Sequence, residues 1–321
     1  SQGEENKIEK VVGREILDSR GNPTVEVDVY VGKKLISRES APSGASTGSN
    51  EALELRDKED RYLGKGVKKA VENVSTTLND ALKGNSLDDL VKLDDIMRKT
   101  DGTELKQNVG GNAITGTSFS LAAAGAKLSE EELFIYLNKQ FRKITGETEE
   151  PTKYKLPLPC ANILNGGKHA GGKLKIQEFM ICPKSGIEFK EQIRILAEVY
   201  HHLGKKVVEK KGTSAKNVGD EGGYAPNFDE AEEAISVIEE AVESAGYKVG
   251  EDIFICLDAA ASEFYDKEQN KYEISEGKFI TPDEMVDFWA DLVEKHPAII
   301  SIEDPLDEKD YETWTKLTEK N

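Results

Sequence analysis

Several apolar segments of this chain run directly into acidic residues, and this pattern limits the possible folds more than any other feature. Each segment resembles a buried strand, and the acids follow at once: Asp220 and Glu221 within 217–227, Asp258 after 253–257, and Glu303 with Asp304 after 298–302. In a parallel α/β barrel the C-terminal ends of the strands share one face, so these acids would converge on one site. Carboxylates gathered beside a dry core must bind a cation, share protons, or do both.

The charge balance excludes several classes of function. The 321 residues contain 43 Lys plus Arg against 61 Asp plus Glu, a formal net charge of −18. Such an acidic chain lacks the basic surface on which general nucleic-acid binding depends, and it would be repelled by anionic membranes. The polar N-terminus does not resemble a signal peptide, and no apolar run approaches the ~20 residues of a membrane span. We therefore expect a soluble, cytoplasmic protein.

The cysteines support the same compartment. Cys160, Cys182 and Cys256 each lie inside or beside an apolar run, and their spacing matches no metal-binding motif. An odd number suits no closed set of disulfides, so we expect buried, reduced thiols.

Residues 1–142 predict an α+β domain. Valines alternate with polar residues from Val25 to Val31, which indicates the central strand of an antiparallel meander. Helical patterns follow at 67–82, 87–99 and 113–128, and Ser129 with Glu132 predicts a capping box for a further helix. The loop 41–49, rich in small and hydroxyl residues, is either a plain connection or a lid that closes over an anion or metal.

Residues 143–321 predict an α/β barrel domain, entered through an acidic, proline-containing linker at 144–159. Strand-like segments at 156–164 and 174–182 precede a long helix at 188–210. Thr281 followed by proline and Glu284 is a strong helix start, before the strand that ends at Glu303. Strands that alternate with helices are typical of a barrel or a doubly wound sheet.

Seven motifs, taken in order, resemble the enolase family along nearly the whole chain. They are DSRGNPTVE from Asp18, SGASTG from Ser43, NGGKHAG from Asn165, QEFM from Gln177, VGDEGG from Val218, Asp258 with ASEF from Ala261, and SIEDP from Ser301. The resemblance implies an α+β N-terminal domain followed by an enolase-type TIM barrel. It also implies a lyase, phosphopyruvate hydratase, which dehydrates 2-phosphoglycerate to phosphoenolpyruvate in glycolysis.

The resemblance also implies roles for individual residues. Two Mg²⁺ ions would stabilise the enediolate that forms when the weakly acidic α-proton is removed. Their ligands would be Asp258 and Glu303 for the tightly held ion and Ser46, on the mobile loop, for the second. The other implied roles are proton donation to the leaving hydroxyl by Glu221 with Glu178 beside it, and substrate binding by His169, Gln177, Glu178 and Glu303.

Taken alone, some of these residues have plainer interpretations. His169 could be an ordinary loop histidine, and Glu178 a charge at the end of a strand. Asp220, Asp304 and Glu263 are left outside the predicted site, as acids that either support its ligands or stabilise the fold.

The sequence departs from the family pattern after Glu303. The family has a further strand with a third metal-binding aspartate, a general-base lysine, a His-Arg-Ser loop and another lysine, and residues 304–321 hold none of these. Five barrel strands can be counted, so we expect a barrel that is incomplete at its C-terminus. On its own the segment should bind Mg²⁺ weakly and show no dehydratase activity.

Two rival functions stay open. One is another α-proton-abstracting member of the same superfamily, although the pair of Glu178 and Glu221 favours hydroxyl elimination. The other is a non-catalytic or surface-displayed form that binds a protein such as plasminogen, for which the ending Lys320-Asn321 gives little support. A homodimer is expected because family members are usually dimers.

Overall fold

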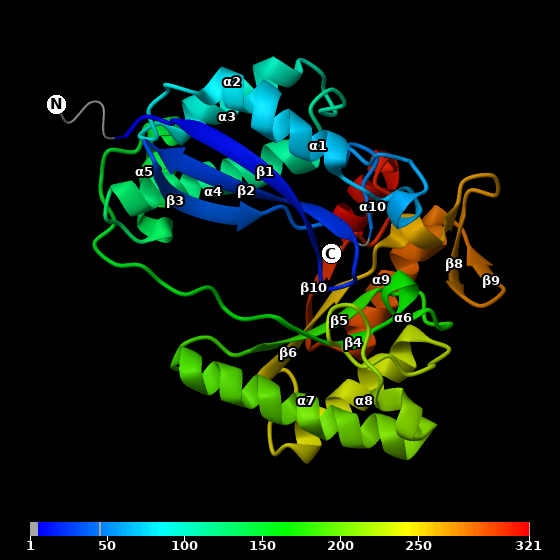
Figure 1. Ribbon diagram of the computed structural model, residues 1–321. Coiled ribbons are helices and arrows are strands. Elements are labelled where there is room, and N and C mark those ends of the chain that lie inside the picture. Colours follow the sequence, from blue (N-terminus) through cyan, green and yellow to red (C-terminus); the bar gives the residue numbers. More distant parts are fainter. Residues whose placement is uncertain (1–5, 45, 321) are drawn as a thin grey trace. The chain divides into compact units, whose positions relative to one another are not determined.

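The computed structural model describes residues 6–44 and 46–320, and the chain divides into two compact units (Figure 1). The units are Ser1–Thr152 and Lys153–Asn321. Each unit has its own buried core.

The first unit is built on the predicted antiparallel meander. Strands β1 (Lys10–Leu17), β2 (Pro23–Val31) and β3 (Lys34–Ser40) pair in that order. Val25, Val27 and Val29 are fully buried on one face of β2, as their alternation indicates. The opposite face is not open to water at Asp28, which is also fully buried. β2 is therefore covered on both faces at this point, where the alternation alone predicted a half-buried strand.

Helices cover this sheet and complete the α+β unit. Their bounds are η1 (Arg61–Gly64), α1 (Lys68–Asn73), the π-helical turn η2 (Val74–Leu78), α2 (Asn79–Leu82), α3 (Leu90–Asp101), α4 (Gly111–Leu128) and α5 (Leu133–Thr145). Small residues let α4 approach the strands closely, since a Cβ on Gly116 would lie 3.3 Å from Val27. The capping box predicted at Ser129 and Glu132 is wrong. Ser129 closes α4 through its backbone N–H, and Glu132 begins α5 with no side-chain cap.

The second unit consists of a four-stranded sheet with helices packed against it. Its elements are β4 (Ala161–Asn165), α6 (Gly167–Ala170), β5 (Glu178–Pro183), α7 (Phe189–Lys211), η3 (Thr213–Lys216), α8 (Ala231–Ser244), β6 (Ile253–Asp258), η4 (Ala261–Phe264), α9 (Pro282–Lys295), β10 (Ile299–Glu303) and α10 (Tyr311–Lys320). A small side sheet joins β7 (Tyr265–Asp266), β8 (Lys271–Ser275) and β9 (Lys278–Ile280). The predicted capping box of Thr281 and Glu284 is present at the start of α9.

The main sheet has the order β10-β6-β5-β4, and its strands do not all run in the same direction. β10 pairs with β6 in parallel, with helix α9 as the crossover, whereas β5 is antiparallel to both β6 and β4. Between β4 and β5 the chain contains only the single-turn helix α6, so it reverses without crossing the sheet. Glu178, which begins β5, therefore reaches this edge of the sheet from the start of an antiparallel strand.

One predicted strand is absent. Residues 217–227 form a loop whose backbone pairs with the sheet at an isolated bridge between Tyr224 and Leu164, while a second bridge joins Tyr224 to Val218 within the loop. Three glycines and a proline within this stretch explain why it does not continue as a ladder. Within 153–320 the main sheet thus has four strands rather than the five expected.

Alternation along β5 and β6 gives the sheet two faces. Phe179, Ile181, Ile255 and Leu257 are buried in the cluster that also holds the apolar sides of α7 and α8. Glu178 and Asp258, each next to one of these residues in sequence, point to the other face. None of the helices in the described part of the chain combines the length and apolar character that a bilayer crossing requires.

Candidate active site

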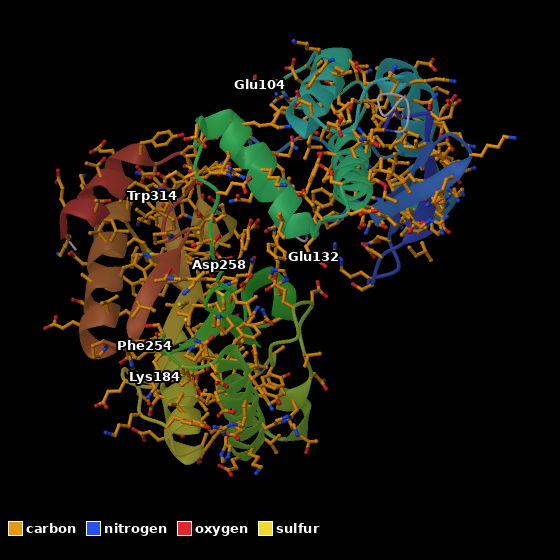
Figure 2. All side chains as sticks on the ribbon, turned by 90° about the vertical axis from the view of Figure 1, so that its left-hand side faces the viewer. Glu104, Glu132, Lys184, Phe254, Asp258 and Trp314 are labelled. Carbon is orange, nitrogen blue, oxygen red and sulfur yellow. The ribbon has the colours of Figure 1, made fainter. Side chains whose placement is uncertain are left out.

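Strand register places three acids side by side at one edge of the main sheet. Glu178 lies opposite Asp258 across β5 and β6, and Asp258 lies opposite Glu303 across β6 and β10. Because β5 is antiparallel, its first residue lies at the same edge as the last residues of β6 and β10. Figure 2 shows Asp258 at the opposite end of β6 from Phe254. Neighbouring strands are only about 4.8 Å apart, so these carboxylates are held close together.

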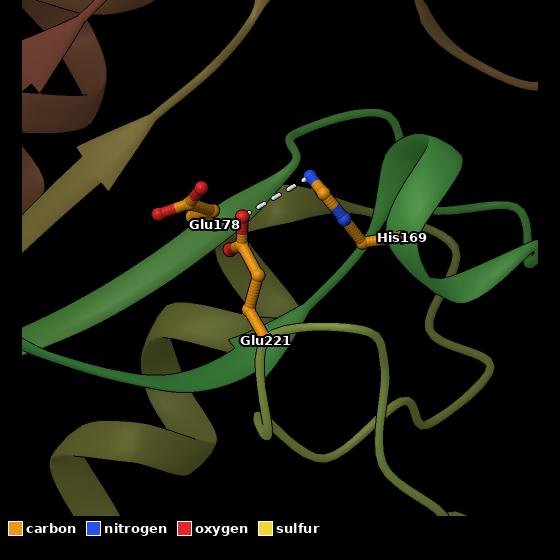
Figure 3. A group of neighbouring side chains, drawn as sticks. All are labelled: His169, Glu178 and Glu221. Atoms are coloured by element: carbon orange, nitrogen blue, oxygen red, sulfur yellow. Dashed lines mark ion pairs between the residues drawn. The ribbon is translucent and has the colours of Figure 1, made fainter. Parts of the chain in front are cut away.

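A second cluster joins this row at Glu178. One ligand-type atom from each of His169, Glu178 and Glu221 lies within 4.8 Å of the others, and the three side chains converge in Figure 3. His169 Nε2 lies 3.4 Å from Glu221 Oε1. An imidazole and two carboxylates therefore meet at one point, although Glu221 lies far along the chain from His169 and Glu178.

Glu221 is carried by a tight loop fastened to β4. Gly219 donates from its N–H to the Gly223 carbonyl at 2.8 Å, which closes a turn around Glu221, and Gly222 adopts a φ of +83°. Gly223 packs so closely that a Cβ there would lie 2.4 Å from Asn165 Oδ1. The glycines noted in the sequence are thus required by backbone conformation and by space.

His169 is carried by the glycine-rich connection between β4 and β5. Gly166 donates to the Gln177 carbonyl at 3.0 Å, and a Cβ on Gly166 would lie 2.3 Å from the Ile176 carbonyl oxygen. The side chain of His169 is only 4% exposed, so it is not a free loop histidine. Gln177, beside Glu178, is also buried.

Buried polar atoms without a partner concentrate here. Among the described residues five such side-chain atoms are found, and four of them belong to this part of the molecule: Asn162 Oδ1, Asn165 Oδ1, His169 Nδ1 and Gln177 Oε1. Buried polar groups are normally hydrogen-bonded, because an unsatisfied one costs about 1–3 kcal/mol. Their concentration indicates a surface prepared for a polar ligand.

Asp258, Glu303 and Asp304 form the group that could hold a metal ion. One carboxylate oxygen from each lies within 4.8 Å of the others. The backbone around them is strained, since Ala260 and Asp304 both adopt a φ of +45°. Ala259 donates to the Glu303 carbonyl at 2.9 Å and thereby fixes the two strand ends together. A set of carboxylate oxygens alone fits Mg²⁺, which prefers hard oxygen ligands.

Glu178, Asp258 and Glu303 lie side by side without a cationic side chain paired to them among the described residues, and this determines their electrostatics. Among the described residues no lysine or arginine forms an ion pair with Glu178, Asp258 or Glu303. Burial, together with the hydrogen bond and charge of Glu221, raises the pKa of Glu178 to about 8. Burial and the charge of Glu303 raise the pKa of Asp258 to about 6. The site therefore retains protons near neutrality unless a cation replaces them.

The predicted residues are not all brought together in one unit. His169, Gln177, Glu178, Glu221, Asp258 and Glu303 all lie in the second unit, at the edge described above. Ser46 belongs to the first unit, in the loop after β3, and its neighbour Ala45 lies outside the described residues.

Sequence reasoning missed two residues at this edge. It left Asp304 outside the predicted site, although its carboxylate joins Asp258 and Glu303. It did not consider Asn162, whose Nδ2 donates to Glu221 Oε2 at 2.6 Å. Asn162 could have been noticed because it lies on the same strand as Asn165, three residues before the glycine-rich motif begins there.

The expectation of three buried thiols also needs correction. Cys182 and Cys256 are buried, but Cys160, which precedes β4, is exposed. All three are free, and contact with the Cys256 thiol raises the pKa of Cys160.

Two family models and a relative match this chain. Residues 8–137 match the family described as enolase, N-terminal domain, and residues 153–321 match enolase, C-terminal TIM barrel domain. An enolase from Corynebacterium kroppenstedtii is 49% identical over 312 residues, which is 97% of this chain and 70% of that protein. The predicted class, an α+β domain followed by a TIM barrel domain, is thereby confirmed.

Proposed function

The chain belongs to the enolase family, and from this premise we propose that the protein catalyses the Mg²⁺-dependent dehydration of 2-phosphoglycerate to phosphoenolpyruvate. The observation that carries the proposal is the meeting of two acidic clusters at one sheet edge. One contains only carboxylate oxygens, and the other combines two glutamates with a buried histidine. The reaction needs both a cation site and a proton donor.

Asp258 and Glu303 are proposed to hold one Mg²⁺ ion, and Ser46 to contribute to a second. Asp304 is an additional candidate because its carboxylate lies with theirs. When bound, the ions supply positive charge that stabilises the extra negative charge on the substrate carboxylate after the α-proton is removed. The raised pKa of Asp258 supports this assignment, since a carboxylate crowded by other acids gains most from a cation.

Glu221 and Glu178 are proposed to handle departure of the β-hydroxyl. A hydroxyl leaves as water only if it receives a proton, and the glutamate pair retains one because the pKa of Glu178 is raised to about 8 by burial and by Glu221. Glu221 is assigned as the donor, with Glu178 beside it.

His169 and Gln177 are proposed to bind the substrate, together with Glu178 and Glu303. Both His169 and Gln177 are buried and carry an atom without a hydrogen-bond partner, which a polar substrate could satisfy. His169 is assigned to the phosphate end.

Residues 1–321 on their own are proposed to be inactive. Among the described residues no lysine or arginine forms an ion pair with Glu178, Asp258 or Glu303, and the proposed reaction needs a base for the α-proton. The relative extends beyond the matched region, which spans 70% of its length.

By family resemblance we also propose a cytoplasmic homodimer, which sedimentation of the purified protein would test.

The deciding experiment measures Mg²⁺-dependent formation of phosphoenolpyruvate by the protein expressed from its own gene, by Glu221→Gln, and by residues 1–321 alone. We expect turnover only in the first. Equal turnover by Glu221→Gln would overturn the role of Glu221, and turnover by residues 1–321 would overturn their predicted inactivity. No turnover in any sample would overturn the enzyme assignment and make protein binding the next hypothesis.

A further inference from the structure

Asn162 contacts the carboxylate of Glu221, and none of the proposed roles uses it. Its Nδ2 lies 2.6 Å from Glu221 Oε2. The other oxygen of Glu221, Oε1, lies 3.4 Å from His169 Nε2. The carboxylate is thus held at one oxygen by an amide while the second oxygen faces the histidine.

Glu221 determines the orientation of this amide. Asn162 Oδ1 is buried and has no hydrogen-bond partner. A carboxylate oxygen accepts hydrogen bonds, so the amide must present its NH₂ group rather than its oxygen. Within residues 6–44 and 46–320 the hydrogen bond to Glu221 is the one found for the Asn162 side chain, and we take it as the interaction that Asn162 is placed to make.

Both partners are fixed to the same strand. Asn162 lies within β4, opposite Met180 of β5. The loop of Glu221 is tied to β4 by Tyr224, which donates to the Ile163 carbonyl at 3.0 Å and accepts from the Asn165 N–H at 2.8 Å. A short hydrogen bond between groups on one rigid frame fixes the direction of the carboxylate.

Helix α7 contacts the loop that carries Glu221 and supports its backbone. The Tyr200 hydroxyl donates to the Gly222 carbonyl at 2.8 Å, and the Tyr200 ring stacks on Tyr224 at 4.3 Å between centroids. The backbone next to Glu221 is therefore held independently of Asn162. Loss of the Asn162 side chain should release the carboxylate without releasing the loop.

We propose that Asn162 is a positioning residue for the elimination step, which rests on the function proposed above. In that step the bond between the β-carbon and its hydroxyl oxygen breaks, and the electron pair left at the α-carbon forms the double bond. Glu221 gives its proton to the departing oxygen, which leaves as water. Asn162 holds Glu221 Oε2 so that the proton-bearing group points at the hydroxyl. Removal of the α-proton does not involve Glu221 and should not need Asn162.

This separation of steps provides the test. In D₂O, α-proton removal is measured by exchange of the substrate's α-hydrogen for deuterium, and elimination by formation of phosphoenolpyruvate. For Asn162→Ala we expect elimination to fall about 10- to 100-fold, the usual effect of a misdirected catalytic group. Exchange should fall less than about twofold and KM should change little, since the substrate contacts remain.

Two further variants control the experiment. Asn162→Asp keeps the size but replaces the donor with an acceptor, so we expect elimination at least as low as in Asn162→Ala. Asn73→Ala removes a comparable hydrogen bond in the first unit, in which the side-chain amide of Asn73 donates from Nδ2 to the Val109 carbonyl at 3.0 Å. It should leave both rates unchanged.

The outcomes separate this inference from the proposed function. A wild-type protein that shows neither exchange nor elimination overturns both. With an active wild type, the inference alone is overturned if Asn162→Ala eliminates at the wild-type rate, or if exchange and elimination fall by the same factor. Thermal unfolding of each variant, measured beside the rates, confirms that the compared proteins are folded.

Discussion

Asp28 in the first unit and Asp258 in the second are both aspartates on strands inside a sheet, yet their surroundings are opposite. Asp28 is fully buried and accepts hydrogen bonds from two guanidinium groups, including Arg14 Nη1 at 2.9 Å and Arg38 Nε at 2.7 Å. Asp258 accepts from the Ala260 N–H at 3.1 Å and has two acids as strand neighbours.

The two environments move the pKa in opposite directions. The hydrogen bond from Arg14 holds the pKa of Asp28 far below its ordinary value. Burial and Glu303 raise that of Asp258 to about 6. An acid supplied with its own cations serves the fold, because its charge is already satisfied. An acid held among other acids is unstable as it stands and is available for a cation or a proton.

The largest difference should appear in catalysis. Asp258→Asn is expected to lower Mg²⁺-dependent turnover at least about 1,000-fold, because the cation loses a charged ligand and with it several kcal/mol of stabilisation. Asp28→Asn, measured below its own melting temperature, should keep turnover within about twofold. The comparison fails if Asp258→Asn retains a tenth of the activity, or if folded Asp28→Asn loses it.

The next effect concerns pH in the absence of metal. A carboxyl group whose pKa is higher in the folded protein than in the unfolded chain makes the folded state hold more protons, so stability falls as pH rises. For Glu178 and Asp258 together this window runs from about pH 4 to 8. Both groups are partly exposed, and we expect a loss of about 4 kcal/mol, roughly half the full linkage value.

Urea unfolding in the presence of a chelator would measure this slope. The variant Glu178→Gln with Asp258→Asn is the matched control and should flatten it. Asp28 does not contribute to the pH dependence of stability between about pH 5 and 8. Its lowered pKa keeps it ionised in the folded protein, and its contribution to stability is lost only at more acidic pH. A wild-type protein whose stability rises between pH 5 and 8 would contradict the raised pKa values.

The third effect tests the paired acid. Asp28→Asn is expected to lower the free energy of unfolding by about 3 kcal/mol, because it leaves two guanidinium groups without their shared carboxylate at a buried position. Chemical denaturation at neutral pH would measure the change. A loss of less than about 1 kcal/mol in the free energy of unfolding would contradict a stabilising role for Asp28 in this sheet.

How far the sequence predicts the fold depends on how local the cause is. Alternating valines around Val27 predicted β2 because burial on one face has a strict period of two. Thr281 and Glu284 predicted a helix start because both partners of the capping box lie in one turn. Ser129 and Glu132 have the same spacing, but α4 runs on to Leu128 and uses Ser129 for its own end. Only tertiary packing of α4 decides between these outcomes.

Sequence patterns selected the candidate residues more readily than they predicted the geometry of the candidate site. Residue type and order predicted Glu178, Asp258 and Glu303. The antiparallel direction of β5, which brings Glu178 to their edge, depends on a chain reversal that residue patterns do not encode locally. Asp304 was missed because its place in the group depends on a φ of +45°, and Asn162 because its partner Glu221 is 59 residues away.

The smallest expected effect is a change in stability at Asp258, and its sign distinguishes Asp258 most clearly from Asp28. In metal-free protein at pH 8, Asp258→Asn should raise the free energy of unfolding by about 2 kcal/mol, since it removes a carboxylate crowded by Glu178 and Glu303. The same exchange of aspartate for asparagine would then destabilise one unit and stabilise the other. Added Mg²⁺ should reverse the order, because only the wild type gains stability from binding the ion. If Asp258→Asn were destabilising without metal, the acids at this edge would be structural partners like Asp28, and the proposed cation site would have no electrostatic basis.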